Sequence, residues 1–199
     1  MAEYFDFEAE LLDLPGERRF RRFHLAQSAA TFDDLHQAIQ GACGWRGDHL
    51  FTFAPIAGPP IAACDADRDT DADPASSVKL APVLSSGIYS MLYNYDFGDD
   101  WWLHVRLRGV LDSDETYHRK LIDGAGAFPP EDCGGPLRFL ELLSAFERKQ
   151  TGKKLDEEQR ELIQWAGPWL PRFDLTTTAA QFDLGRRPRR PSPQRSRGP

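Results

Sequence analysis

The sequence predicts an α+β fold, a single domain with a mainly antiparallel sheet and flanking helices. Three observations predict it. Residues 88–110 contain two strand-like runs around a short acidic turn, residues 4–12 alternate between apolar and polar side chains, and residues 31–44 have the spacing of an amphipathic helix. The chain has 199 residues, of which 41% are hydrophobic and 28% charged, and this is enough for one sizeable core.

The chain begins with two predicted strands. Residues 4–12 place apolar side chains on one face and acidic side chains mostly on the other, as a half-buried strand does. A turn at Pro15 and Gly16 follows, and residues 18–25 are predicted to form the return strand.

The next predicted element is a helix with a signal at each end. Thr31 can cap its first turn, Asp34 can reach back in a capping box, and Gly44 suits the left-handed position after the last turn. His36 and Gln40 lie off its apolar stripe, so we expect His36 at the surface or in a hydrogen bond.

The middle of the chain alternates between order and irregularity. A strand is predicted around residues 50–53, and a short helix or strand at residues 80–84. Between them, residues 55–77 are predicted to form an acidic irregular loop, with Asp at every second position from 65 to 73. That run lacks the Gly and Glu of a calcium loop, so a solvated loop is favoured.

The central hairpin is the most informative stretch. Apolar and polar side chains alternate from Trp101 to Arg108, which predicts a strand with one buried face. It is joined to the preceding strand by the turn at residues 96–100, where Gly98 can adopt a positive φ and Asp side chains can bind turn amides.

The remaining elements are mainly helical. A Gly/Pro-dense loop is predicted at residues 124–136, helices at 137–148 and 156–166, an extended segment at 169–173 and a short helix at 176–182. We place the domain at residues 1–184. Residues 185–199 are an Arg/Pro/Ser-rich tail that is predicted to be disordered.

The net charge of −7 conceals an asymmetry. The tail holds six of the 24 Lys and Arg residues and no acid, so the rest of the chain has 18 bases against 31 acids, a charge near −13. A body this acidic should repel the phosphates of nucleic acid unless its bases cluster. We therefore expect from the tail at most a weak nucleic-acid contact.

Cysteine content and apolar runs indicate the compartment. Cys43, Cys64 and Cys133 are far apart and form no metal-binding or disulfide pattern, so reduced structural thiols are expected. No apolar run approaches membrane-spanning length and the N-terminus does not resemble a signal peptide. We expect a cytoplasmic protein without membrane contact.

Several short sequence blocks along the chain form a distinctive pattern. The blocks are Arg21-Arg22, residues 35–45 with His36 and Trp45, His49-Leu50-x-x-Phe53, Tyr93-x-Tyr95-Asp96-Phe97-Gly98-Asp99-x-Trp101, Pro129-Pro130-Glu131-Asp132-x-Gly134-Gly135, and Phe173-Asp174. Together these blocks resemble the plasmid pRiA4b ORF-3-like family, whose order they follow over residues 4–182. The resemblance implies an α+β domain and a frequent association with mobile elements, but no established reaction.

Two departures from the family pattern affect the site residues. The family usually has Trp-x-His after the acidic turn, but here that position is Leu103, and His104 fits only with a one-residue shift to the other strand face. After Gly134 and Gly135 the family often has Gly-Tyr, where this chain has Arg138 and Phe139. The role of the family histidine therefore does not carry over directly.

The candidate site residues are carboxylates from two glycine-containing turns, with two neighbours. Asp96, Asp99, Glu131 and Asp132 are the oxygen ligands of a predicted Mg²⁺ or Mn²⁺ site if the turns converge. The competing interpretation, which is favoured, is that the carboxylates bind turn amides and pair with Arg21 or Arg106. The candidate surface also includes Asp100, Trp102 and His104.

The other motif residues are expected to be structural. Trp45 and Trp101 are predicted to pack in the core, whereas Trp102 is the best exposed aromatic candidate. A metal cluster of His36, His49 and His104 is the less favoured interpretation of the histidines. The expected structural set is His36, Trp45, His49, Tyr95, Phe97, Gly98, Trp101, Gly134 and Gly135.

Two functions remain open on the sequence. The favoured hypothesis is a non-enzymatic module without a cofactor that binds a protein or peptide through the sheet and the Trp102 surface, because no nucleophile–base arrangement or cofactor motif occurs. The alternative is a divalent-metal-dependent hydrolase or nuclease that uses Asp96, Asp99, Glu131 and Asp132.

Overall fold

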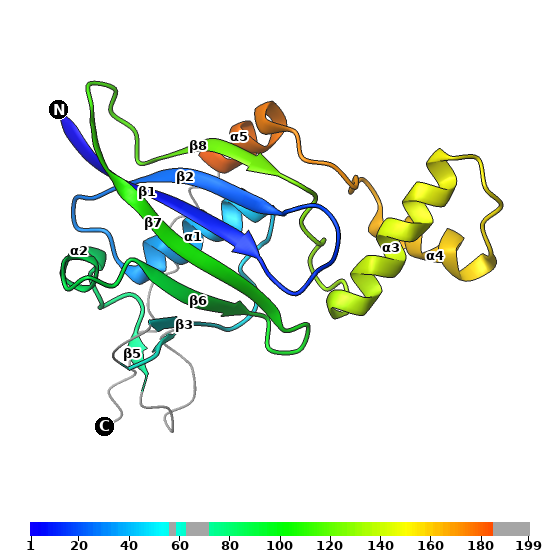
Figure 1. The fold of residues 1–199 in the computed structure, drawn as a ribbon, viewed down its shortest axis with the longest axis horizontal. Helices are drawn as coiled ribbons and strands as arrows, with labels where there is room; N and C mark the ends of the chain where they lie inside the picture. Colours follow the sequence, from blue (N-terminus) through cyan, green and yellow to red (C-terminus); the bar gives the residue numbers. More distant parts are fainter. Residues whose placement is uncertain (56–58, 63–71, 185–199) are drawn as a thin grey trace, which may run out of the picture.

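The structure, a computed structural model, describes residues 1–55, 59–62 and 72–184. Within them the chain forms one eight-stranded sheet and five helices (Figure 1), which confirms the predicted α+β class. The strands are β1 (Ala2–Leu11), β2 (Phe20–Ala26), β3 (Phe51–Pro55), β4 (Ile61–Ala62), β5 (Asp73–Pro74), β6 (Ser90–Tyr95), β7 (Trp101–Ser113) and β8 (Arg119–Ala125). The helices are α1 (Phe32–Cys43), α2 (Leu80–Ser85), α3 (Gly135–Gln150), α4 (Glu157–Ala166) and α5 (Leu175–Leu184).

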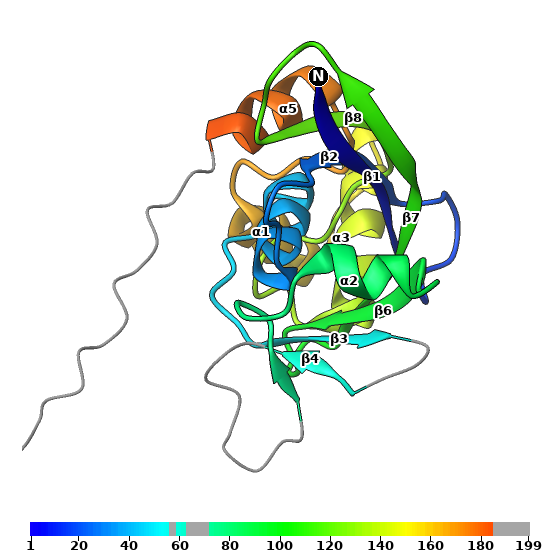
Figure 2. The same ribbon diagram turned by 90° about the vertical axis from the view of Figure 1, so that its left-hand side faces the viewer.

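The sheet has the order β5-β4-β3-β6-β7-β1-β2-β8, so the first strand lies between β7 and β2 in its interior. Its neighbouring strands are antiparallel except for the short parallel pair of β4 and β5. Helices α1 and α5 pack on one face, and among the described residues no helix covers the opposite face (Figure 2). Helices α3 and α4 form a hairpin that projects beyond the end of the sheet (Figure 1).

The core lies between the sheet and α1. Phe5, Phe7 and Ala9 of β1 are buried and belong to the same apolar cluster as Leu35 and Ile39 of α1. Burial of such side chains is the main favourable contribution to folding. Trp45 and Trp101 are also in the core, as predicted.

The helix ends follow the predicted signals. Thr31 accepts a hydrogen bond from the Asp34 amide and the Asp34 carboxylate binds back, so the capping box of α1 is complete. Gly44 is left-handed after α1, and Asp156 caps α4 in the same way as Thr31 caps α1.

The C-terminal half differs from the sequence-based expectation. No strand was predicted between the central hairpin and the loop at residues 124–136, but β7 continues to Ser113 and β8 pairs with β2 at the sheet edge. Only Leu121 of β8 is buried, which explains why the segment has no strand-like alternation. Residues 169–173, which were predicted to be extended, belong to no strand of the described sheet and include a bend at Pro171 and Arg172. The buried apolar side of α3 consists of Phe139, Leu142 and Ala145.

Arg21 fixes the segment that leads from β8 toward α3. Its guanidinium donates to the carbonyls of Ala42, Ala125 and Gly126 and lies between the rings of Phe128 and Phe173, at 4.4 and 4.1 Å from their centroids. Burial lowers the pKa of Arg21 to about 10. Its hydrogen-bond acceptors are carbonyls, so the expected pairing with an Asp of the acidic turns is wrong.

Some predictions fall outside the described residues. They are the acidic positions 65–71 of the predicted loop and the tail at 185–199. The described flanks of that loop contain the two-residue strands β4 and β5. None of the helices in the described part of the chain combines the length and the apolar character needed to span a bilayer.

Candidate metal centre

Three segments that are distant in sequence meet at one end of the sheet. They are residues 44–50 between α1 and β3, the turn at 96–100 between β6 and β7, and the loop at 128–135 before α3. Each supplies at least one polar side chain to a common cluster. The cluster therefore depends on the tertiary fold and not on one local motif.

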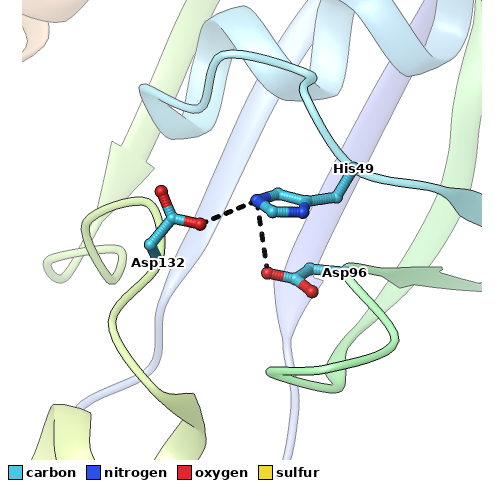
Figure 3. Close-up of side chains that lie close together, drawn as sticks. All are labelled: His49, Asp96 and Asp132. Carbon is cyan, nitrogen blue, oxygen red and sulfur yellow. Dashed lines mark hydrogen bonds and ion pairs between the residues drawn. The ribbon is translucent and has the colours of Figure 1, made fainter.

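His49 is the centre of this cluster (Figure 3). Its Nε2 atom lies 2.9 Å from Oδ1 of Asp132 and 3.5 Å from Oδ2 of Asp96. Oε1 of Glu131 is 3.8 Å from the same nitrogen. One imidazole nitrogen thus faces three carboxylates from two different turns.

The local backbone directs two of these carboxylates. Asp96 and Asp132 both have a left-handed backbone, with φ of 55° and 57°. Oδ1 of Asp96 accepts from the amides of Gly98 and Asp99, which leaves Oδ2 directed toward His49. Asp tolerates this conformation better than most residues, although it still has an energetic cost that is common at functional sites.

Residues 45 and 46 connect the His49 segment to the loop before α3. The Trp45 indole donates to the Pro129 carbonyl, at 2.9 Å. The Arg46 amide donates to Oε2 of Glu131, and its guanidinium donates to Oδ2 of Asp132 at 2.8 Å. These contacts hold Oδ1 of Asp132 near His49 and restrict the exposed loop.

Glu131 is held from both sides. The Tyr95 hydroxyl donates to its Oε1 at 2.5 Å, while the Arg46 amide binds its Oε2. Burial and the neighbouring Glu131 carboxylate raise the pKa of Tyr95, so its hydroxyl keeps its proton at neutral pH. The sequence left open whether Glu131 and Asp132 face the same space, and both lie within 4 Å of His49.

Asp99 and Asp100 lie outside this cluster. Oδ2 of Asp99 accepts from the Gly134 amide at the start of α3, at 2.9 Å. Oδ1 of Asp100 accepts from Asn94 and from the Trp102 indole, at 2.9 and 2.8 Å. Of the four carboxylates in the predicted ligand set, Asp96, Glu131 and Asp132 therefore face His49. The Asp99 carboxylate instead connects the turn to the start of α3.

The remaining predicted residues occupy other regions. Trp102 is only half-buried and lies on the uncovered face of the sheet with His104, whose Nε2 contacts the Ser90 hydroxyl. His36 is buried beneath the sheet, so it does not lie at the surface. The other predicted role, a hydrogen-bonding side chain, is confirmed by its contact with the Tyr93 hydroxyl. Phe97 is exposed at the turn tip, and Gly98 supplies one of the amides that bind Asp96.

The cluster has the donor atoms and the dimensions of a metal site. Nε2 of His49 and one oxygen each of Asp96 and Asp132 lie within 4.8 Å of one another. Ligands bound to one ion at about 2.1 Å are about 3.0–3.5 Å apart when they occupy adjacent positions. An imidazole with two carboxylates favours Zn²⁺ or Mn²⁺ over the Mg²⁺ expected for oxygen ligands alone.

The sequence favoured a structural role for His49 and considered it as a metal ligand only together with His36 and His104. Those two histidines instead contact Tyr93 and Ser90. The position of His49 directly before a predicted strand did not reveal that it faces the two acidic turns. The available signal was its placement in the His-Leu-x-x-Phe block, one of the three blocks that supply the site.

A family model described as plasmid pRiA4b ORF-3-like protein matches residues 5–181 of the chain. The chain belongs to this family. The suspected resemblance is thus confirmed, and the motif blocks with His49, Asp96 and Asp132 all lie within the matched range.

Two relatives of this pRiA4b ORF-3-like chain carry names without an assigned activity. A protein of unknown function from Methanosarcina mazei Go1, MM3350, has a crystal structure that is similar with a TM-score of 0.76 and 25% sequence identity, over 89% of this chain and 98% of that one. The uncharacterized protein y4hQ of Sinorhizobium fredii (strain NBRC 101917 / NGR234) is 29% identical over 149 residues, which are 74% of this chain and 72% of y4hQ.

Proposed function

We propose that the protein is a metal-dependent hydrolase that binds one Zn²⁺ or Mn²⁺ ion through His49, Asp96 and Asp132. The observation that carries this proposal is the convergence of these three ligand atoms from separate segments. The side chains of His49 and Asp132 are 31% and 54% exposed, so an ion between them remains open to water and substrate. A catalytic site needs such an open coordination position.

The chemistry follows from the ion and its neighbours. A Zn²⁺ ion held by His49, Asp96 and Asp132 would lower the pKa of a coordinated water to about 7 and so would supply a nucleophile at neutral pH. Glu131 would act as the general base, because its Oε1 lies 3.8 Å from Nε2 of His49. Tyr95 and the Arg46 amide hold this carboxylate in place. We place this activity in the cytoplasm.

The proposal is tested first by metal binding and then by hydrolysis. The unfolding temperature is measured in EDTA and then with Mg²⁺, Mn²⁺, Ca²⁺ and Zn²⁺ in turn. A ligand that binds only the folded state raises this temperature as its concentration rises. We expect a rise with Mn²⁺ or Zn²⁺, and hydrolysis of activated ester or phosphate substrates by the loaded protein.

The variants Asp96→Asn and His49→Gln should lose the rise, because each removes one ligand while keeping a similar shape. Asp99→Asn is the matched control, since its carboxylate binds the Gly134 amide instead of His49. Its response to metal should equal that of the unaltered protein. No rise with any metal, or an equal rise in Asp96→Asn and Asp99→Asn, would refute the metal site.

A second candidate is a non-enzymatic module that binds a protein or peptide of mobile elements. The observation that favours it is apolar exposure next to Trp102: Leu92 is 40% exposed on the same sheet face and Phe97 is 52% exposed at the turn. Large exposed apolar side chains that lie close together are typical of interaction sites.

This second candidate is tested by capture of plasmid-encoded proteins on the immobilised protein. Leu92→Ser with Phe97→Ser should abolish capture of a specific partner. Leu137→Ser, at an exposed leucine of α3, is the control that should retain it. Equal capture by both variants would exclude this surface as the binding site.

A further inference from the structure

The uncovered face of the sheet carries an exposed layer of arginines, which we call the arginine face. Arg22 lies on β2, Arg106 and Arg108 lie on β7, and Arg18 extends from the turn between β1 and β2. All four surround β1, which runs through the interior of the sheet between β7 and β2. The four basic side chains therefore form one cluster although they are separated in sequence.

The acidic partners of these arginines lie beneath them. Glu8 and Glu10 of β1 each accept hydrogen bonds from Arg18 and Arg106, at 2.6–2.8 Å, and Asp6 accepts from Arg22. The three carboxylate side chains are only 7–24% exposed, whereas the four guanidinium side chains are 34–53% exposed. A molecule that approaches this face meets guanidinium groups first.

The charges on this face persist over a wide pH range. Burial alone would raise the pKa of Glu8, but hydrogen bonds from Arg18 and Arg106 outweigh it and lower that pKa. The hydrogen bond from Arg18 likewise lowers the pKa of Glu10. The hydrogen bond to Asp6 raises the pKa of Arg22. Glu8 and Glu10 therefore stay ionised at neutral pH, and each guanidinium group, with five N–H donors, has more donors than its carboxylate partners use.

The acidic composition of residues 1–184 predicts repulsion of nucleic-acid phosphates unless the bases cluster, and the position of these arginines meets that condition. Residues 1–184 hold 18 bases and 31 acids. Asp123 of β8 is the cross-strand partner of Arg22 and belongs to the same face, so the face holds four arginines and four acids, and 14 bases and 27 acids lie elsewhere. The bases do cluster, and they cluster above their own acids. The arginine face is thus set apart from the strongly acidic remainder of the chain.

Two planar side chains extend the arginine face along β7. Trp102 and His104 lie on the same side of this strand as Arg106, at alternate positions. Residues two apart on one strand are about 6.6–6.8 Å apart. A row of rings and guanidinium groups is the combination that binds unpaired bases by stacking and phosphates by charge. An acidic peptide would use the guanidinium groups but not the rings.

We propose that the arginine face binds a single strand of nucleic acid, with Arg18, Arg22, Arg106 and Arg108 at its phosphates and Trp102 and His104 against its bases. The acidic remainder of the molecule opposes long strands, so binding is weak and depends strongly on salt. The proposal does not require the metal.

The arginine face nevertheless ends at the turn that carries Asp96. The Trp102 indole donates to Asp100, and the Asp100 amide donates to the Asp96 carbonyl. If the metal site is hydrolytic, its substrate is therefore a phosphodiester.

The test measures binding of a fluorescent oligothymidylate by anisotropy, with the full chain in EDTA so that no metal contributes. Arg18→Gln with Arg108→Gln is the informative variant, since Arg106 still pairs with Glu8 and Glu10 in it. We expect affinity at low salt to fall about tenfold or more. The slope of log affinity against log salt should fall by about 1.4, because each phosphate contact on a single strand contributes about 0.7.

Two further variants make the result specific. Trp102→Leu should weaken binding about fivefold or more without changing the salt slope, because stacking releases no counterion. Arg138→Gln with Arg172→Gln removes two arginines away from this face and should leave both affinity and slope unchanged. Unfolding temperatures in the same buffer show that each variant is folded.

Three outcomes would overturn the proposal. Unchanged affinity in Arg18→Gln with Arg108→Gln would assign any binding to another basic segment, including the tail. Equal weakening in the two double variants would show only an effect of net charge. Competition by oligoglutamate as strong as that by unlabelled oligothymidylate of equal charge would make the ligand an acidic peptide instead. Because EDTA is present, failure here leaves the metal proposal intact, and the reverse also holds.

Discussion

At the scale of single residues, His36 is a buried base with a low pKa. Its Nδ1 lies 2.7 Å from the Tyr93 hydroxyl and its ring stacks on Phe51, with centroids 3.7 Å apart. Burial lowers its pKa from 6.5 to about 3, so the folded protein keeps it neutral where the unfolded chain takes up a proton. Stability should therefore fall as pH decreases from 6.5 toward 3, by up to about 1.4 kcal/mol per pH unit from this group.

The measurement is urea unfolding of the protein and of His36→Gln between pH 7 and pH 4. The variant is expected to be less stable at pH 7, because it loses the stacked ring, but its stability should depend less steeply on pH. His118→Gln is the control, since His118 is exposed and its loss should keep the original slope. Identical slopes in His36→Gln and the unaltered protein would show that His36 is protonated while folded.

Side-chain roles are where sequence reasoning succeeded least. It grouped Asp96, Glu131 and Asp132 as converging carboxylates only in its less favoured interpretation, and all three lie within 4 Å of His49. It also included Asp99, which turns to the Gly134 amide. The difference depends on which oxygen a local amide holds. That information is absent from residue spacing, because Asp96 and Asp99 belong to the same five-residue turn.

At the scale of elements, the start of α3 depends on a glycine against the acidic turn. Gly135 has φ of 83°, and an added Cβ would lie 3.1 Å from the Asp99 carbonyl oxygen. Gly152, just after α3, has φ of 68° but open space around it. Left-handed backbone costs a residue with a Cβ about 1–2 kcal/mol, and this cost applies to both positions.

We expect Gly152→Ala to lower the free energy of unfolding by about 1 kcal/mol, and Gly135→Ala to lower it by more, because the Asp99 backbone must also move. Urea unfolding of both variants gives the comparison. Gly135→Ala should also reduce the increase in unfolding temperature caused by metal, since Asp96 shares a turn with Asp99. Equal losses of stability in Gly135→Ala and Gly152→Ala would mean that the turn at residues 96–100 moves away from the added Cβ at no cost in free energy.

Elements with end signals or clear periodicity were predicted well. Thr31, Asp156 and Gly44 mark helix ends by chemistry that acts within four residues, and the central hairpin follows from strict alternation. The strand β8 was missed, because it is held by its pairing with β2 and has little apolar signal of its own. Local rules therefore locate elements that are locally determined, and miss an edge strand stabilised by a distant neighbour.

At the scale of the whole molecule, the two proposed surfaces share one hairpin. Its turn supplies Asp96 to the metal centre, and its second strand supplies Arg106 and Arg108 to the arginine face. The fold class followed from the sequence, whereas both surfaces required the strand order. Asp6, Glu8 and Glu10 are simple alternation in the sequence, and only the placement of β1 between β7 and β2 brings them under arginines from both neighbours.

The interior position of β1 also bears on how the chain is made. Strand β1 leaves the ribosome before the other strands of this sheet; its neighbour β2 ends at Ala26, but its other neighbour, β7, ends only at Ser113. Pairing across such a separation closes a long loop and is slow. During synthesis one edge of β1 therefore stays unpaired until β7 emerges. An unpaired strand edge can form hydrogen bonds with other chains and so promotes aggregation. The edge of β1 that faces β7 is unpaired in this way while residues 27–113 are being added.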